Sequence, residues 1–140
     1  MDIKIILLLF DFGLVVLIWL VQLVVYPSFK KYSKNNLIDW HTVYVKRIAI
    51  IVGPLMIGQL IISGWLLYQQ QSSSALIIFL LVLLLWGSTF THFAPLHQRI
   101  SNGSFDSSML DKLEKRNWIR TVLWTLIFIL GIIQIYPYSI

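Results

Sequence analysis

The chain has 140 residues, of which 58% are hydrophobic and 12% are charged. A soluble domain carries charge on about a quarter of its residues, so this composition excludes an ordinary soluble protein, and the length excludes two domains of usual size. The lack of cysteine excludes disulfides, thiolate metal ligands and a cysteine nucleophile, although it leaves the compartment open.

Four apolar stretches follow one another along the chain, and each approaches the roughly 20 residues that cross the hydrocarbon layer as a helix. They cover residues 5–26, 48–68, 75–96 and 118–136. The first is a retained helix rather than a signal peptide, because it is long, contains Asp11 and lacks a small-residue cleavage site. The sequence therefore predicts an all-α protein whose residues 1–140 form a single four-helix transmembrane bundle, up-down-up-down.

The positive charges lie on one side of this predicted topology. Every lysine and arginine except Lys4 falls in or beside the first and third connections, whereas residues 69–74 and the C-terminal tail have none. By the positive-inside rule the two basic connections are cytoplasmic and both termini lie outside, in a multi-pass protein of the bacterial inner membrane. The net charge of +5 is thereby explained without a nucleic-acid partner.

Helix signals extend beyond the apolar stretches. Asn35 and Asn36 precede a helical pattern that reaches the second span, and Ser108 with Asp111 forms a capping box before the fourth. The serines at 72–74 offer a cap for the third helix, and Pro54 predicts a kink in the second. Tyrosines and tryptophans at the span edges, among them Tyr26 and Tyr68, are typical of an interfacial aromatic belt.

Three polar side chains within the spans are predicted to be structural. At 1.5 Å per residue, Asp11 lies about 9 Å and Gln59 about 13 Å below the outer ends of their spans, so both lie in the outer half of the membrane. Gln59 and Ser63 are the candidate hydrogen-bond partners of Asp11. An intramembrane aspartate marks either an ion pathway or a hydrogen bond that holds helices together. Gln22, near the inner end of the first span, is the third such residue.

The cytoplasmic half holds all three histidines. His41 begins the second helix, and His92 and His97 end the third, so two helices bring imidazoles to the same side of the membrane. This arrangement suits a haem, a metal or proton transfer, with His92 or His97 as the ligand. Five residues turn an ideal helix about 140° past a full circle, so these two share a face only if the helix bends or unwinds at Pro95.

The fourth helix carries a polar stripe at the same level. Asn117, Arg120 and Trp124 recur at helical spacing, and with Tyr44 of the second helix they complete the predicted ligand-binding residues. Arg120 is placed either to hold an oxygen-rich group or to snorkel to the interface. The alternatives for the histidines are lipid phosphate contact for His97 and a buried interhelical hydrogen bond for His92.

The segments VYPSF, WHTVYVKR, GPLM, STFTHFAPLH and KRNWIRTVLW resemble a bacterial family of small four-helix membrane proteins, similar to the anthrone-oxygenase-like group. A more distant similarity in length and topology is to the haem-associated four-helix protoporphyrinogen oxidase. The chain departs from the family at Tyr44, where a second histidine often stands, and at Gln59, where an acid does, which leaves the activity open. The resemblance matches His41, Pro54, His97, Asn117, Arg120 and Trp124 to the family pattern.

We therefore expect a site for a lipophilic ligand or cofactor, of the haem or quinone class, in the cytoplasmic half. If the protein is an enzyme, a cofactor-dependent membrane oxidoreductase is expected, in which histidine ligates or relays protons. The alternative is a non-enzymatic protein that binds membrane lipids or assembles, with itself as a homo-oligomer or with a partner. Gly53, Gly58 and Gly64 on the second span would suit such close helix contacts.

Overall fold

The computed structural model describes residues 2–136 and confirms the predicted all-α four-helix fold. The first and third long helices are each interrupted by a π-helical segment, whereas the second and fourth are continuous α-helices. The first helix consists of α1 (Ile3–Leu20), η1 (Val21–Val25) and α2 (Tyr26–Phe29); the second is α3 (Lys34–Gln70); the third consists of α4 (Ser73–Ser88), η2 (Thr89–Phe93) and α5 (Ala94–Ser101); the fourth is α6 (Ser107–Ile135).

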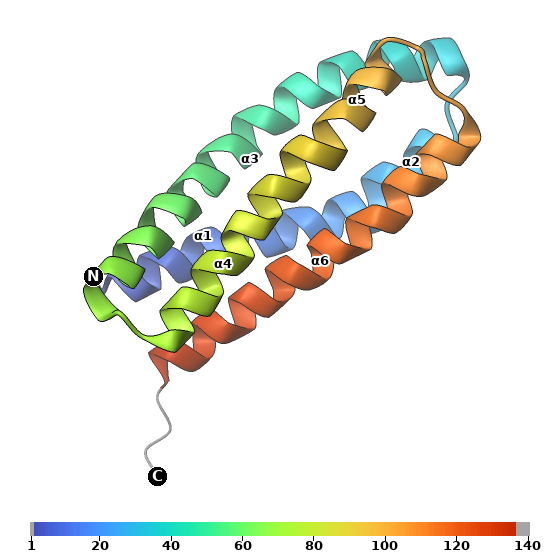
Figure 1. Cartoon of the computed structure of the whole chain (residues 1–140). Helices are drawn as coiled ribbons and strands as arrows, with labels where there is room; N and C mark the ends of the chain where they lie inside the picture. The colour runs from blue at the N-terminus through green and yellow to red at the C-terminus, as the bar shows by residue number, and fades with distance from the viewer. Residues whose placement is uncertain (1, 137–140) are drawn as a thin grey trace.

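The helices form a ring in which each packs against two neighbours (Figure 1). Helix α1 contacts α3 and α6, and α4 contacts the same two from the other side. Successive helices run in opposite directions, so the chain start, the α3–α4 connection and the end of α6 lie together (Figure 1). The opposite end, which holds residues 30–33 and 102–106, is called the basic end below, because the lysines and arginines gather around it.

All four long helices are long and apolar enough to cross a membrane. Helix α3 has 37 residues, about 55 Å at 1.5 Å per residue, which exceeds the roughly 30 Å of hydrocarbon. It begins at Lys34, which confirms that the second helix starts well before its apolar stretch. The chain is thus a multi-pass membrane protein.

The surface is apolar, and the interior combines two apolar clusters with several buried polar side chains. Ile50, Ile61 and Ile119 are each more than 60% exposed on the outside of the bundle. Side chains that a soluble protein would leave in water are instead buried here: Asp11, Gln22, His41, Gln59, Asn117, Arg120 and Thr121. Lipid contact accounts for the first set, and the cost of polar groups in hydrocarbon accounts for the second.

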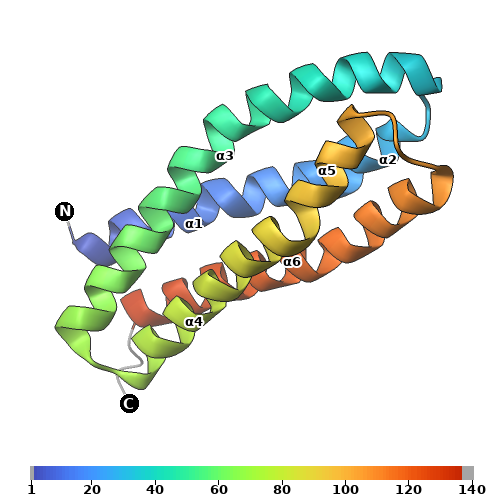
Figure 2. The same ribbon diagram turned by 45° about the horizontal axis from the view of Figure 1, so that its top comes forward.

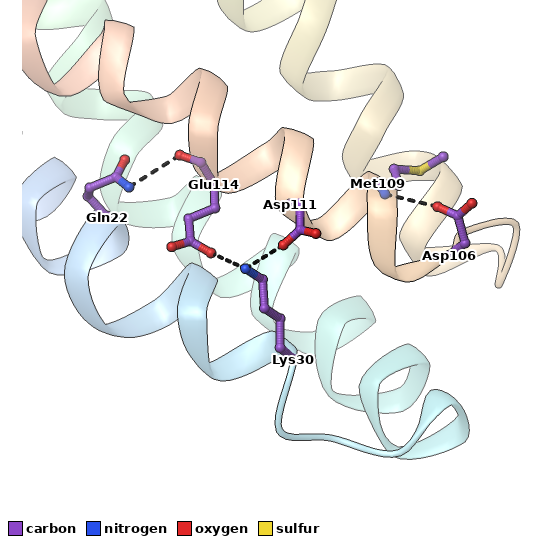
Figure 3. Close-up of polar contacts among 6 residues, drawn as sticks. All are labelled: Gln22, Lys30, Asp106, Met109, Asp111 and Glu114. Carbon is purple, nitrogen blue, oxygen red and sulfur yellow. Dashed lines mark hydrogen bonds and ion pairs between the residues drawn. The ribbon is translucent and has the colours of Figure 1, made fainter.

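Helices α4 and α6 are capped at their starts by side chains, whereas Ser33 at the start of α3 makes no capping hydrogen bond. Ser72 accepts a hydrogen bond from the Ala75 N–H at 3.3 Å, as the sequence predicted. The predicted cap at Ser108 is wrong, because Asp106 caps α6 by accepting from the Met109 N–H at 2.9 Å (Figure 3). Asp106 is the last extended residue of the connection, and its short carboxylate reaches the free N–H groups of the first turn.

An ion-pair cluster joins the first and fourth helices at the basic end (Figure 3). Lys30 Nζ lies 2.6 Å from both Asp111 Oδ1 and Glu114 Oε2. The hydrogen bonds to Asp111 and then Glu114 raise the pKa of the Lys30 ammonium above its ordinary value. These side chains are partly exposed, so the cluster fixes the register of the two helices more than it stabilises the fold.

Pro54 lies inside α3 without ending it. The helix stays α-helical from Lys34 to Gln70, and Figure 2 shows it changing direction near its middle. Proline lacks the N–H that would bond the carbonyl four residues earlier and crowds that carbonyl, which is a recognised cause of bending. The predicted kink is therefore seen as a bend in a continuous helix.

Two of the three glycines of α3 lie at close contacts within the chain. A methyl group added to Gly58 would lie 2.3 Å from the Phe10 ring, and one added to Gly64 would lie 3.3 Å from the Phe79 ring. Gly53 has nothing within 4 Å of that position. The close approach of α1 to α3 thus requires Gly58, and this contact is used inside one chain.

We expect Gly58→Ala to destabilise the bundle by about 1–3 kcal/mol, because the new methyl group forces the Phe10 ring to move. The matched control is Gly53→Ala, which adds the same methyl group in open space on the same helix. Thermal unfolding in mild detergent, followed by circular dichroism, measures both. A Gly58→Ala protein as stable as the control would contradict the proposed close contact.

Candidate ligand-binding site

Two π-helical segments shape the half of the bundle nearer the basic end. Both η1 and η2 end two residues before a proline, Pro27 and Pro95 respectively. A π turn adds a residue to the turn, which relieves the crowding that a proline ring imposes on the preceding turn and rotates everything that follows. As a result, Tyr26 at the start of α2 is only 3% exposed, and His97 of α5 reaches its hydroxyl. The predicted place of Tyr26 in an interfacial belt is wrong.

A chain of four hydrogen-bonded side chains runs through this region. Tyr26 Oη lies 3.0 Å from His97 Nε2, His97 Nδ1 lies 2.9 Å from His41 Nε2, and His41 Nδ1 lies 2.8 Å from Ser101 Oγ. Phe29 holds His41 by an edge-on contact with ring centroids 5.4 Å apart. All four imidazole nitrogens of His41 and His97 are therefore engaged with other side chains.

A cavity of about 480 Å³ lies beside this chain, between α3 on one side and η2 and α5 on the other. Its wall is mostly apolar, with contributions from α1 and α6 and a few polar groups, which is the usual make-up of a small-molecule site. The polar or partly polar side chains of the wall are Tyr26, Tyr44, Thr89, His97, Gln98, Ser101, Arg120 and Trp124.

Arg120 is the one side chain of this wall that carries a fixed charge. It is 7% exposed, and its guanidinium carbon lies 4.3 Å from the centre of the Phe93 ring and 4.9 Å from that of Trp124. The Tyr26 hydroxyl lies within hydrogen-bonding reach of it, and Tyr44 is close enough to interact with its charge. Its Nε is buried without a hydrogen-bond partner, and within residues 2–136 the ion pairs found are those of Lys30.

Arg120 thus departs from the rule that a buried charge is paired. Cation–π contact with two rings offsets part of the cost of removing the guanidinium from water, but these rings supply no hydrogen-bond acceptor for its N–H groups. The predicted alternative of a snorkelling arginine does not describe a side chain that is 93% buried and faces a cavity. An oxygen-bearing ligand is the partner that the arrangement can accept.

The structure brings together five of the seven predicted ligand-binding residues: His41, Tyr44, His97, Arg120 and Trp124. His92 is separate, because it is exposed and borders a small hollow with Arg116 on the outer side of η2. Unwinding at residues 89–93 does occur, yet it leaves His92 outside and His97 inside, so the two do not share a face. Both the ligand role and the buried interhelical hydrogen bond predicted for His92 lack support in this position.

Asn117 is buried but turns away from the cavity. Its Nδ2 donates to Gln22 Oε1 at 2.9 Å, and Gln22 Nε2 donates to the Glu114 carbonyl at 3.2 Å (Figure 3 shows the second bond). Thr121 adds a weaker contact to the same oxygen at 3.5 Å. These bonds fasten η1 to α6 next to the cavity, so Gln22 has the structural role predicted for it, and Asn117 shares that role.

The predicted meeting of Asp11 and Gln59 is present in the half of the bundle nearer the chain ends. Gln59 Nε2 donates to Asp11 Oδ1 at 2.7 Å, and Trp124 Nε1 donates to Gln59 Oε1 at 3.4 Å. Asp11 and Gln59 are both fully buried. Trp124 therefore touches this polar group at its N–H and the Arg120 guanidinium at its ring face.

Three residues of the site escaped the sequence reading: Tyr26, Phe93 and Ser101. Each lies within two residues of a helix interruption or a helix end, where helical periodicity does not assign a face. The tyrosine–proline pair at 26–27 was the available signal, because a proline so close to a span end favours a local change of helix geometry.

Comparison with protein-family models, with characterised proteins and with solved structures finds no match for this chain. The class of protein to which this chain is assigned therefore depends on its fold and its site alone. They define a multi-pass four-helix membrane bundle with a buried arginine facing an internal cavity.

Replacing Arg120 separates a structural role from a ligand-binding one. Because its charge is buried without a counter-ion, we expect Arg120→Met to raise the stability of the ligand-free protein by about 1–3 kcal/mol. Arg116→Met is the matched control on the exposed face of the same helix. Thermal unfolding in lipid-free detergent measures both, and a clear loss of stability in Arg120→Met alone would show that the guanidinium holds the fold together.

Proposed function

We propose that this protein binds a lipophilic ligand whose oxygen-bearing head lies against Arg120 and whose apolar part fills the cavity. The observation that carries the proposal is the buried guanidinium whose Nε has no hydrogen-bond partner and which faces a space of about 480 Å³. Arginine gives planar, charge-assisted hydrogen bonds to carbonyl and carboxylate oxygens. Tyr26 and Tyr44 add hydroxyl donors on the same side.

A quinone-type head suits this site better than haem. Axial ligation of iron needs a free imidazole nitrogen, whereas both nitrogens of His97 and of His41 are engaged in hydrogen bonds. His92 keeps its nitrogens free but lies outside the cavity. A flat carbonyl compound needs only donors at its oxygens and apolar walls around its ring, and Arg120, Phe93 and Trp124 offer these.

The ligand enters from the lipid layer. Ala49 of α3 and Ala94 of α5 are exposed on the outside of the bundle and also line the cavity, so the opening lies between these helices. Both residues are small and apolar. They therefore leave room for the apolar tail of the ligand and do not obstruct its passage from the hydrocarbon layer into the cavity. The positive-inside rule places this opening in the cytoplasmic leaflet of a bacterial inner membrane.

Two functions use such a site. In an oxidoreductase the bound head exchanges electrons with a second substrate, and in a lipid-binding protein it is only held. The first is favoured by the hydrogen-bonded chain that ends at the cavity, because a protein that only stores lipid has no need of titratable side chains there.

The test is a binding titration with a decyl-tailed benzoquinone, followed by quenching of tryptophan fluorescence in mild detergent. Trp124 lines the cavity, so a bound quinone quenches it. We expect Arg120→Gln to weaken binding by at least about tenfold, or about 1.4 kcal/mol, because the head loses a charge-assisted hydrogen bond. Arg116→Gln, exposed on the same helix, is the matched control and keeps the wild-type affinity.

Circular dichroism and gel filtration first establish that each variant is folded. Equal affinity in wild type and Arg120→Gln would refute Arg120 as the anchor of the head, and the absence of binding in all three proteins would refute the quinone class.

A further inference from the structure

The chain Tyr26–His97–His41–Ser101 has the connectivity of a proton relay. A neutral imidazole has one N–H and one acceptor nitrogen, so a histidine bonded at both nitrogens donates on one side and accepts on the other. Two such histidines in series permit only two arrangements: all donors point toward Ser101, or all point toward Tyr26. Each arrangement converts to the other when one proton moves along the chain.

The two ends of this relay lie in different surroundings. Tyr26 borders the cavity beside Arg120, and His41, in the middle of the relay, is fully buried. Ser101 also lines the cavity, but it is the last residue of α5, next to the 102–106 connection at the basic end, and is partly exposed. The relay therefore links the ligand's head to the aqueous side.

The charges of the cavity wall specify what kind of head is bound. The titratable groups that face the space are Tyr26 from α2, Tyr44 from α3, His97 from α5 and Arg120 from α6, and the residues of α1, η1 and η2 in the wall have none. Arg120 brings one positive charge, and none of the described residues 2–136 adds a carboxylate to the wall. A head that carries one negative charge neutralises this site, whereas a neutral head leaves the guanidinium uncompensated.

A weak acid reaches the cavity from the hydrocarbon as its neutral form, because a bare anion is poorly soluble there. It then has to lose a proton to become the anion that Arg120 favours. The relay gives that proton a route out of a site from which the lipid phase excludes water.

We propose that the ligand is a lipophilic acid, with an acidic hydroxyl on a quinone-type or carboxyl head, that is bound as its monoanion while its proton leaves through Tyr26, His97, His41 and Ser101. This inference rests on the proposed function. The ligand O–H bond breaks, its electron pair stays on the oxygen beside Arg120, and no electron is transferred.

The proton balance closes in both directions. The ligand proton goes to Tyr26 Oη as the tyrosine proton goes to His97 Nε2; the Nδ1 proton of His97 goes to His41 Nε2, that of His41 Nδ1 to Ser101 Oγ, and the serine proton to water. The relay is then reversed, with its donors pointing toward Tyr26. Release of the ligand returns one proton along the same path, which restores the first arrangement.

The probe for the experiment is an alkyl-substituted hydroxynaphthoquinone, whose neutral and ionised forms have different visible spectra. It is added to the full-length protein in mild detergent at a pH where the probe in empty micelles is neutral. We expect binding to produce the spectrum of the anion and an indicator dye to register one proton released per probe bound. Arg120→Gln abolishes both signals, and Arg116→Gln retains both.

The O-methyl ether of the same probe separates this inference from the proposed function. It has the same ring and tail and no acidic proton, and we expect it to bind at least about tenfold more weakly, the loss of one charge-assisted contact. An ether that binds as tightly as the acid would overturn the monoanion and leave the proposed function standing. If neither compound binds, both fail.

The relay itself is tested by the rate of proton release in stopped flow, compared at equal amounts of bound probe. His41→Gln preserves hydrogen bonding but cannot pass a proton between two ring nitrogens, so release slows at least about tenfold. Ser101→Ala is a second variant at the other end of the path, and Thr42→Val, beside His41 but bonded to Ile38, is the control. Release at the wild-type rate in both His41→Gln and Ser101→Ala would overturn the relay.

Discussion

A positive charge enclosed in an apolar bundle is the constraint on which this structure depends. Arg120 is buried to 93%, its Nε has no hydrogen-bond partner, and the ion pairs found within residues 2–136 lie elsewhere, on Lys30. In lipid this arrangement costs several kcal/mol, and two aromatic rings offset only part of that cost. An apolar side chain of similar size would fill this position without that cost. The proposed ligand would supply the partner that the guanidinium lacks.

The surroundings of Arg120 depend on two local departures from the α-helix. The π turns before Pro27 and Pro95 rotate the last turns of the first and third helices, which places Tyr26 and His97 opposite His41. The hydrogen bonds of Gln22 to α6 then fix η1 beside the cavity. Site geometry and membrane insertion are compatible because the freed backbone groups are shielded by neighbouring helices.

Much of the fold follows from properties that the sequence displays openly. The lengths of the apolar stretches predict the number of spans, and the depths of Asp11 and Gln59 in their helices place them at a similar level. Five of the seven residues predicted for the site lie together in the structure because they share one level in the membrane. A local irregularity such as a π turn barely changes this level. This success required no knowledge of side-chain direction.

The failures have a common physical origin. The level in the membrane assigned His92 to the site and the span edge assigned Tyr26 to the interface, and both assignments are wrong because a π turn inserts one residue without changing composition. Asn117 fits the stripe of α6, but its direction is decided by Gln22, almost a hundred residues away in the chain. The N-cap of α6 is Asp106 and not the predicted Ser108, because the preceding loop, rather than the capping motif, sets where the helix starts.

The most direct measurement is native mass spectrometry of the protein released from mild detergent, in wild type and in Arg120→Gln. The account predicts that wild type retains one lipophilic molecule per chain, with an acidic or carbonyl head by fragmentation, and that Arg120→Gln retains none. A wild-type chain without a bound molecule, or the same molecule retained equally by both proteins, would contradict the claim that the buried guanidinium is a ligand anchor.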